Sequence, residues 1–395
     1  MIRVEDLSKD VNPLSKYYSD FKVTERVLLT GHSHQAQPDC AKDGIIECWN
    51  DASALADDKW EKVFAISDEV RKYFAGHLDD EKDNIVLGQN THDLILRFLS
   101  ALDFKNRTKI ITTDGEFHTI RRQLDRLNQG YLDVVKVKRD PVDTLAERII
   151  KEIDSNTSAV MVSKVMFQDA SIVSGLSGVE DVCMKHGAKL LVDVYHVLNA
   201  IPFSIKEENL QNSFLVGGGY KYLQLGEGNC FMRIPPNELF KPVITGWFAE
   251  FAALSGKKVP GEVLYGEKRW AFEGSTYDPV SHYRAVKVFE FFKEHKLTPE
   301  LLREINNHQK DLIASKFNEH DLDPAIIKIT DVKNRAGFIT FLTPHACIIS
   351  KELRKHDVLT DFRGDYLRFG PAPYLTDEQL KQAVYHLKEI TNNLL

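Results

Sequence analysis

The sequence predicts an α/β fold in which a large domain, built on a mainly parallel central sheet sandwiched by helices, precedes a smaller α+β domain. Short apolar runs alternate with amphipathic stretches through the middle of the chain, as in successive βαβ units. Near Thr298 the pattern changes to a long helical stretch followed by two apolar runs. We therefore expect an N-terminal segment over 1–44 that crosses toward the small domain, a large domain over 45–285 and a small domain over 286–395.

Four apolar runs predict buried strands of the large domain, because such runs are short and end in polar residues or glycine. They cover 109–114, 159–165, 189–194 and 213–219. The stretches between them predict helices with one apolar face, over 143–153 and over 175–187.

The C-terminal third predicts the elements of the small domain. One long helix is expected over 298–320, strands over 326–332 and 337–343, and a last helix from Thr376. In open α/β sheets ligands bind at the carboxyl ends of the strands, so the residues that follow each strand are the first candidates for a site.

Composition excludes several classes of function. The 395 residues carry 51 basic and 58 acidic side chains, a net charge of −7, and this balance argues against a nucleic-acid surface. No apolar run is long enough to span a membrane, and the first residues lack the apolar core of a signal peptide. Five scattered cysteines form no CxxC pair, so we expect no structural metal site and a cytoplasmic protein.

Chemically useful side chains follow two of the predicted strands. Asp193 and His196 come at the end of the strand over 189–194, and Lys221 follows a glycine triplet after the strand over 213–219. Each residue alone has a structural explanation, since an aspartate after a strand usually caps a turn and a lysine there is usually exposed. Their occurrence together at successive strand ends favours a common site.

The stretch 86–99 enters a helix through Gln89, Asn90 and Thr91. The free N–H groups of a helix N-terminus bind anions such as phosphate. Pyridoxal phosphate (PLP) needs a lysine, a carboxylate at its pyridine nitrogen and a phosphate cradle. Lys221, Asp193 and this helix start supply these three groups, so the pattern predicts a PLP site.

Longer motifs resemble the fold-type I PLP enzymes of the class V aminotransferase group, and kynureninase most closely. The resemblance spans nearly the whole chain. Its motifs are LLTGHSHQAQP (28–38), DVYHVLNAIPF (193–203), GGGYKYLQLGEGNCFMRIP (217–235), KPVITGWFAEF (241–251), WAFEGSTYDPV (270–280) and DFRGDYLRFGPAPYLT (361–376).

The resemblance implies roles for residues around the cofactor. Lys221 would form the Schiff base, Asp193 would pair with the pyridine nitrogen, and His196 would lie near Asp193 or the phenolic oxygen. Tyr220 would reach the phosphate beside Gln89, Asn90 and Thr91. Phe117, with His118 as second choice, would stack on the cofactor.

The resemblance also implies a homodimer and a substrate site. Thr276 would complete the phosphate site of the neighbouring subunit, with Trp247 beside the cofactor or at the interface. Arg368 would pair with the α-carboxylate of an amino acid substrate. Ser33 and His34 are further candidates for substrate binding.

Some motifs depart from kynureninase. The loop near the substrate aromatic ring is replaced by DASALADDKW (51–60), which keeps only Trp60, Glu116 stands where the family has aspartate, and Thr276 stands where it has asparagine. The implied cofactor machinery is therefore intact, whereas the pocket for an aryl ketone differs.

Four functions follow as alternatives. The first is kynureninase-like hydrolytic Cβ–Cγ cleavage that releases alanine. The second is a cysteine desulfurase or other C–S lyase, suggested by Cys347 in the small domain. The third is a class V aminotransferase. The fourth is a PLP-binding scaffold without turnover, which the joint presence of Lys221, Asp193 and Arg368 disfavours.

Overall fold

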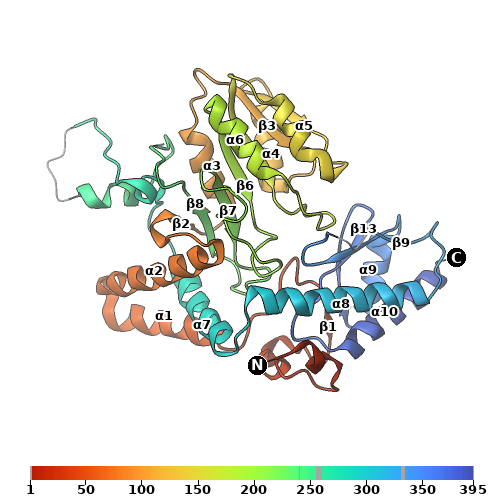
Figure 1. The fold of residues 1–395 in the computed structure, drawn as a ribbon. Helices are drawn as coiled ribbons and strands as arrows, with labels where there is room; N and C mark the ends of the chain where they lie inside the picture. The colour runs from red at the N-terminus through yellow and green to blue at the C-terminus, as the bar shows by residue number, and fades with distance from the viewer. Residues whose placement is uncertain (1, 240, 255–259, 331–333, 395) are drawn as a thin grey trace.

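The central layer of the protein is a seven-stranded sheet with the strand order β2-β8-β7-β6-β5-β3-β4 (Figure 1). The structure is a computed structural model that describes residues 2–239, 241–254, 260–330 and 334–394. The strands are β2 (Ile85–Gly88), β3 (Lys109–Thr113), β4 (Asp133–Val137), β5 (Thr157–Ser163), β6 (Lys189–Asp193), β7 (Phe214–Gly218) and β8 (Cys230–Arg233). Neighbours from β4 to β7 pair parallel, and β8 pairs antiparallel with both β7 and β2. The predicted mainly parallel sheet is confirmed.

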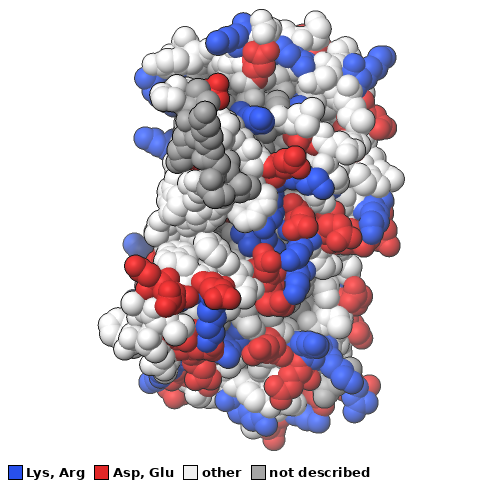
Figure 2. Space-filling view, turned by 90° about the vertical axis from the view of Figure 1, so that its left-hand side faces the viewer, with Lys and Arg blue, Asp and Glu red and all other residues white. Residues whose placement is uncertain are grey.

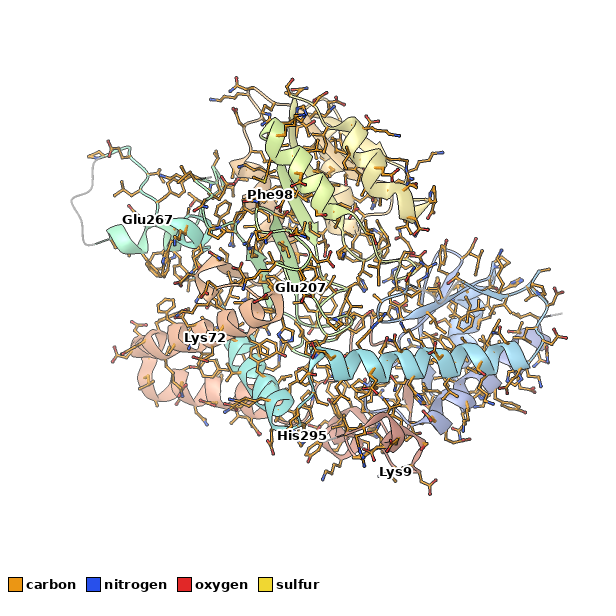
Figure 3. All side chains as sticks on the ribbon, in the orientation of Figure 1. Lys9, Lys72, Phe98, Glu207, Glu267 and His295 are labelled. Carbon is orange, nitrogen blue, oxygen red and sulfur yellow. The ribbon has the colours of Figure 1, made fainter. Side chains whose placement is uncertain are left out.

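Both faces of this sheet are buried along its inner strands, which explains why β5 and β7 are continuous buried runs, whereas the edge strand β4 alternates between exposed and buried residues. Along β5, Val160 and Val162 face one hydrophobic cluster, and Met161 faces the other. The helices that pack against the sheet are α2 (Lys59–Leu78), α3 (Thr91–Ala101), α4 (His118–Leu127), α5 (Leu145–Glu152) and α6 (Leu176–His186), and α7 (Val280–Glu294) packs against α2. On one face Phe98 of α3 contacts Phe214 of β7, with ring centroids 5.0 Å apart (Figure 3).

The small domain contains a four-stranded antiparallel sheet in the order β12-β13-β10-β9. Its strands are β9 (Lys328–Ile329), β10 (Ile339–Leu342), β12 (Asp361–Arg363) and β13 (Tyr366–Phe369). Its helices are α8 (Pro299–Glu319), α9 (Ala346–Arg354) and α10 (Asp377–Asn392). The predicted strand over 326–332 is only two residues long where it is described, and residues 331–332 lie outside the described residues.

The N-terminal segment joins the small domain. Strand β1 (Val27–Leu28) pairs parallel with β11 (Val358–Leu359), and Thr30 bridges Gly370. Helix α1 (Ala41–Leu55) then packs beside α7 (Figure 1). Short 3-10 helices complete the chain: η1 (Val4–Ser8), η2 (Ser15–Tyr17), η3 (Ser19–Phe21), η4 (Ala56–Asp58), η5 (Lys82–Asn84), η6 (Val142–Thr144), η7 (Trp247–Ala253) and η8 (Lys268–Phe272). The boundaries 1–44, 45–285 and 286–395 stay a prediction.

The surface carries charges of both signs. On the face shown in Figure 2, lysines and arginines are interspersed with aspartates and glutamates, and an uncharged area lies on the left of that view. None of the helices within the described ranges combines the length and the apolar character that crossing a membrane requires.

Candidate active site

A cavity of about 390 Å³ opens where β5, β6 and β7 end. It is the place that the topology of an open α/β sheet favours for a ligand. It is lined by Gln89, Asn90, Thr91, His92, Phe117, Thr119, Ser163, Val165, Phe167, Asp193, Tyr195, His196, Tyr220, Lys221, Glu227, Gly228 and Cys230. Eight of the residues predicted for the site therefore meet in one cavity.

Lys221 is the central side chain of this cavity. It is only 6% exposed, and its Nζ lies 2.6 Å from Nε2 of His196. The rings of Tyr195 and Phe117 have their centroids 4.8 Å and 5.6 Å from Nζ. Burial lowers the pKa of Lys221 to about 7, against the attraction of Asp193. The amine is therefore available as a base or nucleophile near neutral pH.

The glycines before Lys221 are required by close packing. A Cβ on Gly218 would overlap the ring of Tyr195, and a Cβ on Gly217 would lie 2.9 Å from the ring of Phe231. Glycine lets β7 end against these rings and carry the chain directly into the lysine loop.

Asp193 ends β6, and its Oδ1 accepts a hydrogen bond of 2.8 Å from the backbone N–H of Tyr195. Burial raises the pKa of this carboxyl group, while the Tyr195 N–H and Lys221 oppose that rise. Burial also lowers the pKa of His196 well below its ordinary value, so its ring is neutral at neutral pH. The site thus brings an amine into contact with a neutral imidazole, with a buried acid close enough to act on the charge of the amine.

A second buried acid, Glu116, lies next to this group. Its carboxylate accepts hydrogen bonds from Oγ1 of Thr113 at 2.6 Å and from Oγ of Ser163 at 2.5 Å. Burial raises the pKa of Glu116 to about 7, and the charge of Asp193 adds to the rise. Ser163 lines the cavity, so it connects Glu116 to the site.

The N-terminus of α3 forms the opposite wall. Asn90 is the N-cap, and its side chain accepts a hydrogen bond of 2.9 Å from the N–H of Asp93. The N–H groups of Thr91 and His92 belong to the first turn, which has no intrahelical acceptors for them. This wall is suited to a phosphate, as the sequence predicts.

Other predicted residues lie at the edge of the cavity. The ring of His34 stacks on Tyr220, with centroids 4.7 Å apart, and its Nε2 lies 3.5 Å from Glu227. Oγ of Ser33 lies 3.3 Å from Nδ1 of His34. His118 is exposed at the start of α4 and is not among the lining residues, so Phe117 is the better placed of the two rings.

Arg368 makes an ion pair inside the protein. Its Nε donates to Oδ1 of Asp361 at 2.8 Å, Nη2 also pairs with this carboxylate, and Nη1 donates to the carbonyl of Phe167 at 2.5 Å. Oδ1 of Asp361 also lies 2.7 Å from Nε2 of His32. Asp361 therefore occupies the face of Arg368 that the sequence assigns to a substrate carboxylate.

Arg363 is a candidate that the sequence analysis did not single out. Its side chain is 40% exposed, and its ion contact with Asp361 is long, at 3.7 Å. Its charge acts on Lys221, although less than that of Arg368, and Arg363 is not among the residues that line the cavity. The motif DFR (361–363) contains this arginine, and the fold shows that it is more exposed than Arg368.

Thr276 and Trp247 do not line the Lys221 cavity within one chain. Trp247 Nε1 donates to Oγ1 of Thr276 at 3.3 Å, and Thr276 lines a neighbouring cavity of about 410 Å³. Gln89 lines both cavities. The predicted contact of Thr276 with a cofactor therefore depends on a second subunit.

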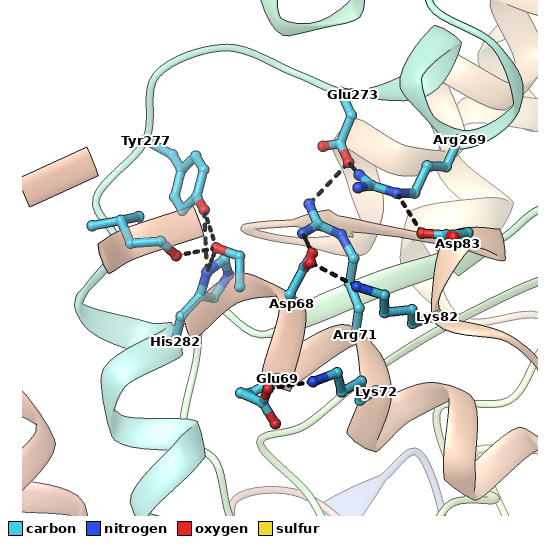
Figure 4. A network of polar contacts seen from close by, with 12 residues as sticks. Asp68, Glu69, Arg71, Lys72, Lys82, Asp83, Arg269, Glu273, Tyr277 and His282 are labelled. Carbon is cyan, nitrogen blue, oxygen red and sulfur yellow. Dashed lines mark hydrogen bonds and ion pairs between the residues drawn. The ribbon is translucent and has the colours of Figure 1, made fainter. Parts of the chain in front are cut away.

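A buried polar network holds the turn before Thr276 (Figure 4). Glu273 Oε1 accepts hydrogen bonds from Nη2 of Arg71 at 2.9 Å and from Nη1 of Arg269 at 2.6 Å. Arg71 also donates to Asp68 at 2.9 Å. All three members of the central group, Glu273 and the two arginines, are at most 6% exposed. The network fixes η8 and the turn that follows it against α2.

Two comparisons concern the sequence. The family model for the kynureninase C-terminal domain matches residues 302–387. An uncharacterized aminotransferase from Bacillus subtilis (strain 168), YcbU, is 20% identical over 368 residues, which cover 91% of this chain and 95% of the relative. The first match confirms the resemblance to kynureninase for this part of the chain.

Three solved structures share the fold. A C-DES variant with glycine covalently linked to its PLP cofactor has a TM-score of 0.83 at 13% identity, covering 95% of this chain and 99% of that chain. A cysteine desulfurase from Thermococcus onnurineus NA1 has a TM-score of 0.74 at 18% identity, covering 100% and 99%. The cysteine desulfurase CsdA from Escherichia coli has a TM-score of 0.77 at 13% identity, covering 98% and 100%. The chain therefore has the fold of the fold-type I PLP enzymes.

Proposed function

We propose that the protein is a PLP-dependent enzyme that acts on an α-amino acid and hydrolyses its Cβ–Cγ bond with release of alanine, as kynureninase does. The observation that carries the PLP assignment is the Lys221 cavity, which combines an amine of low pKa, a buried carboxyl group and a helix N-terminus. The match of residues 302–387 to the kynureninase C-terminal domain supports the choice of reaction.

The residues of the cavity fit this cofactor. Lys221 would bind it covalently, Asp193 would hold a proton on its ring nitrogen, and Phe117 would cover a face of the ring. Thr91 and His92 would receive its phosphate at the start of α3. When bound, PLP withdraws electrons and thereby stabilises negative charge on the substrate carbon next to the amino group.

Lys221 is the base that takes the proton from this carbon. A pKa of about 7 leaves a large share of the amine unprotonated near neutral pH, which suits a base that must accept a proton and return it. His196, 2.6 Å from Nζ, stays neutral and keeps the amine oriented without adding a second positive charge.

Tyr220 would stabilise negative charge on the carbonyl that water attacks. Burial raises the pKa of Tyr220 to about 12, so its hydroxyl stays protonated and can donate a hydrogen bond to an oxyanion. Arg363 and Arg368 would hold the substrate carboxylate. Because Asp361 already pairs with Arg368, the freer guanidinium of Arg363 makes the first contact.

The second candidate function is amine transfer by a class V aminotransferase. The observation that favours it is the match to a Bacillus subtilis protein called an aminotransferase, which covers 91% of this chain. Both functions would use Lys221 to move the proton of the substrate carbon. They differ in the next bonds broken, because the hydrolase adds water to the γ-carbonyl and breaks the Cβ–Cγ bond, whereas the transferase gives up the substrate's amino group and releases a keto acid. A desulfurase needs an accessible thiolate at the site, but Cys347 in α9 does not line the Lys221 cavity.

The test measures alanine released from kynurenine and 3-hydroxykynurenine by the PLP-loaded protein. Lys221→Ala is the inactive variant, and Lys72→Ala, which removes an exposed lysine of α2, is the matched control. Alanine from the native protein and Lys72→Ala, but not from Lys221→Ala, supports the proposal. If a yellow, PLP-loaded protein releases no alanine but transfers an amino group to pyruvate, the hydrolase assignment is wrong and the transferase stands.

Size-exclusion chromatography of the same protein tests the homodimer that the Thr276 prediction needs.

A further inference from the structure

A second polar cavity lies between the N-terminal segment, the loop after Lys221 and helix α8. It shares no lining residue with the Lys221 cavity. Its walls are Gln35, Asn199, Tyr222, Gln224, Leu302, Ile305, Asn306, Gln309, Pro371 and Pro373. Five of these residues carry side-chain amides, and all five are at most 7% exposed.

Each of the five amides has one polar atom without a hydrogen-bond partner. These atoms are Oε1 of Gln35, Nδ2 of Asn199, Nε2 of Gln224, Oδ1 of Asn306 and Oε1 of Gln309. A buried polar atom without a partner costs about 1–3 kcal/mol, so five around one cavity require an explanation.

The other atom of most of these amides is already bound, which fixes their orientation. Nδ2 of Asn306 donates to the carbonyl of Gly337 at 3.0 Å, and Nε2 of Gln309 donates to the carbonyl of Ala372 at 2.8 Å. Because a backbone carbonyl only accepts, neither amide can turn without losing that bond. Their oxygens are therefore left for the cavity. Oε1 of Gln224 accepts a hydrogen bond of 2.7 Å from the hydroxyl of Tyr18, and Nε2 of the same amide is the atom without a partner.

We propose that this cavity is a binding site for ordered water that connects the lysine loop to α8. About 20 Å³ is available to the centre of a water molecule, and one bound water needs roughly 10–15 Å³ by that measure. A buried water usually makes about three hydrogen bonds, as donor and as acceptor. The unpartnered atoms include three oxygens and two N–H₂ groups, so they offer both kinds of partner.

The composition of the walls favours water over a cation. None of the described residues that line the cavity is acidic, so nothing there would compensate a buried positive charge. The N–H₂ groups of Asn199 and Gln224 would also face such an ion with their positive ends.

The water site joins parts of the chain that must keep a fixed relation during catalysis. Gln224 lies three residues after Lys221, and its N–H donates to the carbonyl of Lys221 at 3.0 Å. Asn306 and Gln309 belong to α8, which runs into the small domain (Figure 1). A water that bonds both sides transmits the position of α8 to the backbone of the catalytic lysine.

The direct test is a crystal structure of the full-length protein, with and without a soak in rubidium chloride. We expect density in the cavity at 2.7–3.2 Å from Gln309 Oε1 and Gln224 Nε2, unchanged by the soak. An empty cavity overturns the proposal. An anomalous rubidium peak overturns it too, because the occupant would then be a monovalent cation.

A double-mutant cycle tests the bridge in solution. Gln224→Met and Gln309→Met each remove one amide at similar volume and are expected to lower Tm by about 2 °C. If both amides bind the same water, the Tm decrease of the double variant is smaller, by at least about 1 °C, than the sum of the decreases in the two single variants. The control is Asn318→Leu, at an exposed position of α8. Its effect on Tm should add to that of Gln224→Met without coupling. Strict additivity for the Gln224 and Gln309 pair overturns the bridge.

Discussion

Replacement of Glu273 by glutamine removes the charge on which two buried arginines converge. Arg71 keeps its bond of 2.9 Å to Asp68, whereas the remaining ion contact of Arg269, with Asp83, is long at 3.9 Å, and Asp83 is 68% exposed (Figure 4). The guanidinium of Arg269 also keeps its position 4.0 Å from the ring centroid of Trp270. Breaking a buried ion pair lowers the free energy of unfolding by about 3–5 kcal/mol when one charge is left without a partner. Because Arg71 keeps its bond to Asp68, we expect about 3 kcal/mol, the lower end of this range. The entropy of unfolding is about 2.1 cal/mol/K per residue. For 395 residues, a loss of about 3 kcal/mol therefore corresponds to a Tm decrease of about 4 °C.

The measurement is a thermal scan of Glu273→Gln beside Glu69→Gln. Glu69 is the matched control, because it pairs with Lys72 on the exposed surface of α2, where a pair contributes at most about 1 kcal/mol. We expect the control to lose less than about 1 °C. A Glu273→Gln variant that loses no more than the control would show that the network does not hold the turn, and our reasoning about this turn would fail.

Three further predictions concern the Lys221 cavity. Burial raises the pKa of Glu116 from 4.5 to about 7, so the ionisation of this carboxyl group lowers the free energy of unfolding as pH rises between these values. The free energy of unfolding of Glu116→Gln, relative to that of the native protein, should therefore rise by up to about 3 kcal/mol between pH 5 and pH 8. A pH-independent difference in Tm between the two proteins, without bound cofactor, would contradict this. Gly218→Ala places a Cβ against the ring of Tyr195, so it should lower the free energy of unfolding by about 1–3 kcal/mol and reduce the absorbance of bound PLP. An unchanged absorbance spectrum and Tm would contradict this prediction. Arg363→Gln should raise KM for the amino acid substrate at least about tenfold with little change in kcat, because it removes a contact to the substrate carboxylate, which takes no part in the reaction. An unchanged KM would exclude that contact.

Four of the seven strands of the large sheet, β3, β5, β6 and β7, could be predicted because both of its faces are buried there. Each of the four predicted strands is an apolar run, and its end is visible in the sequence. The direction of β8 was not visible in the same way. Its run CFMR is as apolar as the others, but it turns antiparallel because the Lys221 loop returns the chain directly beside β7.

Helix α1 shows why the N-terminal part of the large domain was not predicted in detail. Its apolar residues do not form one buried face, since Ile45, Ile46 and Trp49 are 43%, 51% and 76% exposed in the single chain. Ile45 and Trp49 follow the i, i+4 spacing of one helix face, so a helix could be expected here, but the sequence does not show that this face is exposed in the single chain.

The central residues of the site could be predicted because they follow strands. Lys221, Asp193 and His196 meet as the order of the strands requires. The state of Arg368 could not be predicted, because its partner is set by the register of the small sheet, where Asp361 on β12 lies opposite Arg368 on β13. Sequence separation alone does not reveal such cross-strand pairs.

The pairing of β1 with β11 has a consequence for synthesis on the ribosome. Val27 and Val358 are 331 residues apart, so the first strand leaves the ribosome long before its partner exists. At about 5–20 residues per second, it waits roughly 20–65 s without that partner. Within this interval the strands of the large sheet, which end at Arg233, emerge and can form around their own core, while the N-terminal segment stays unpaired. A nascent chain released before Val358 therefore carries an open strand edge that a chaperone or another chain can bind.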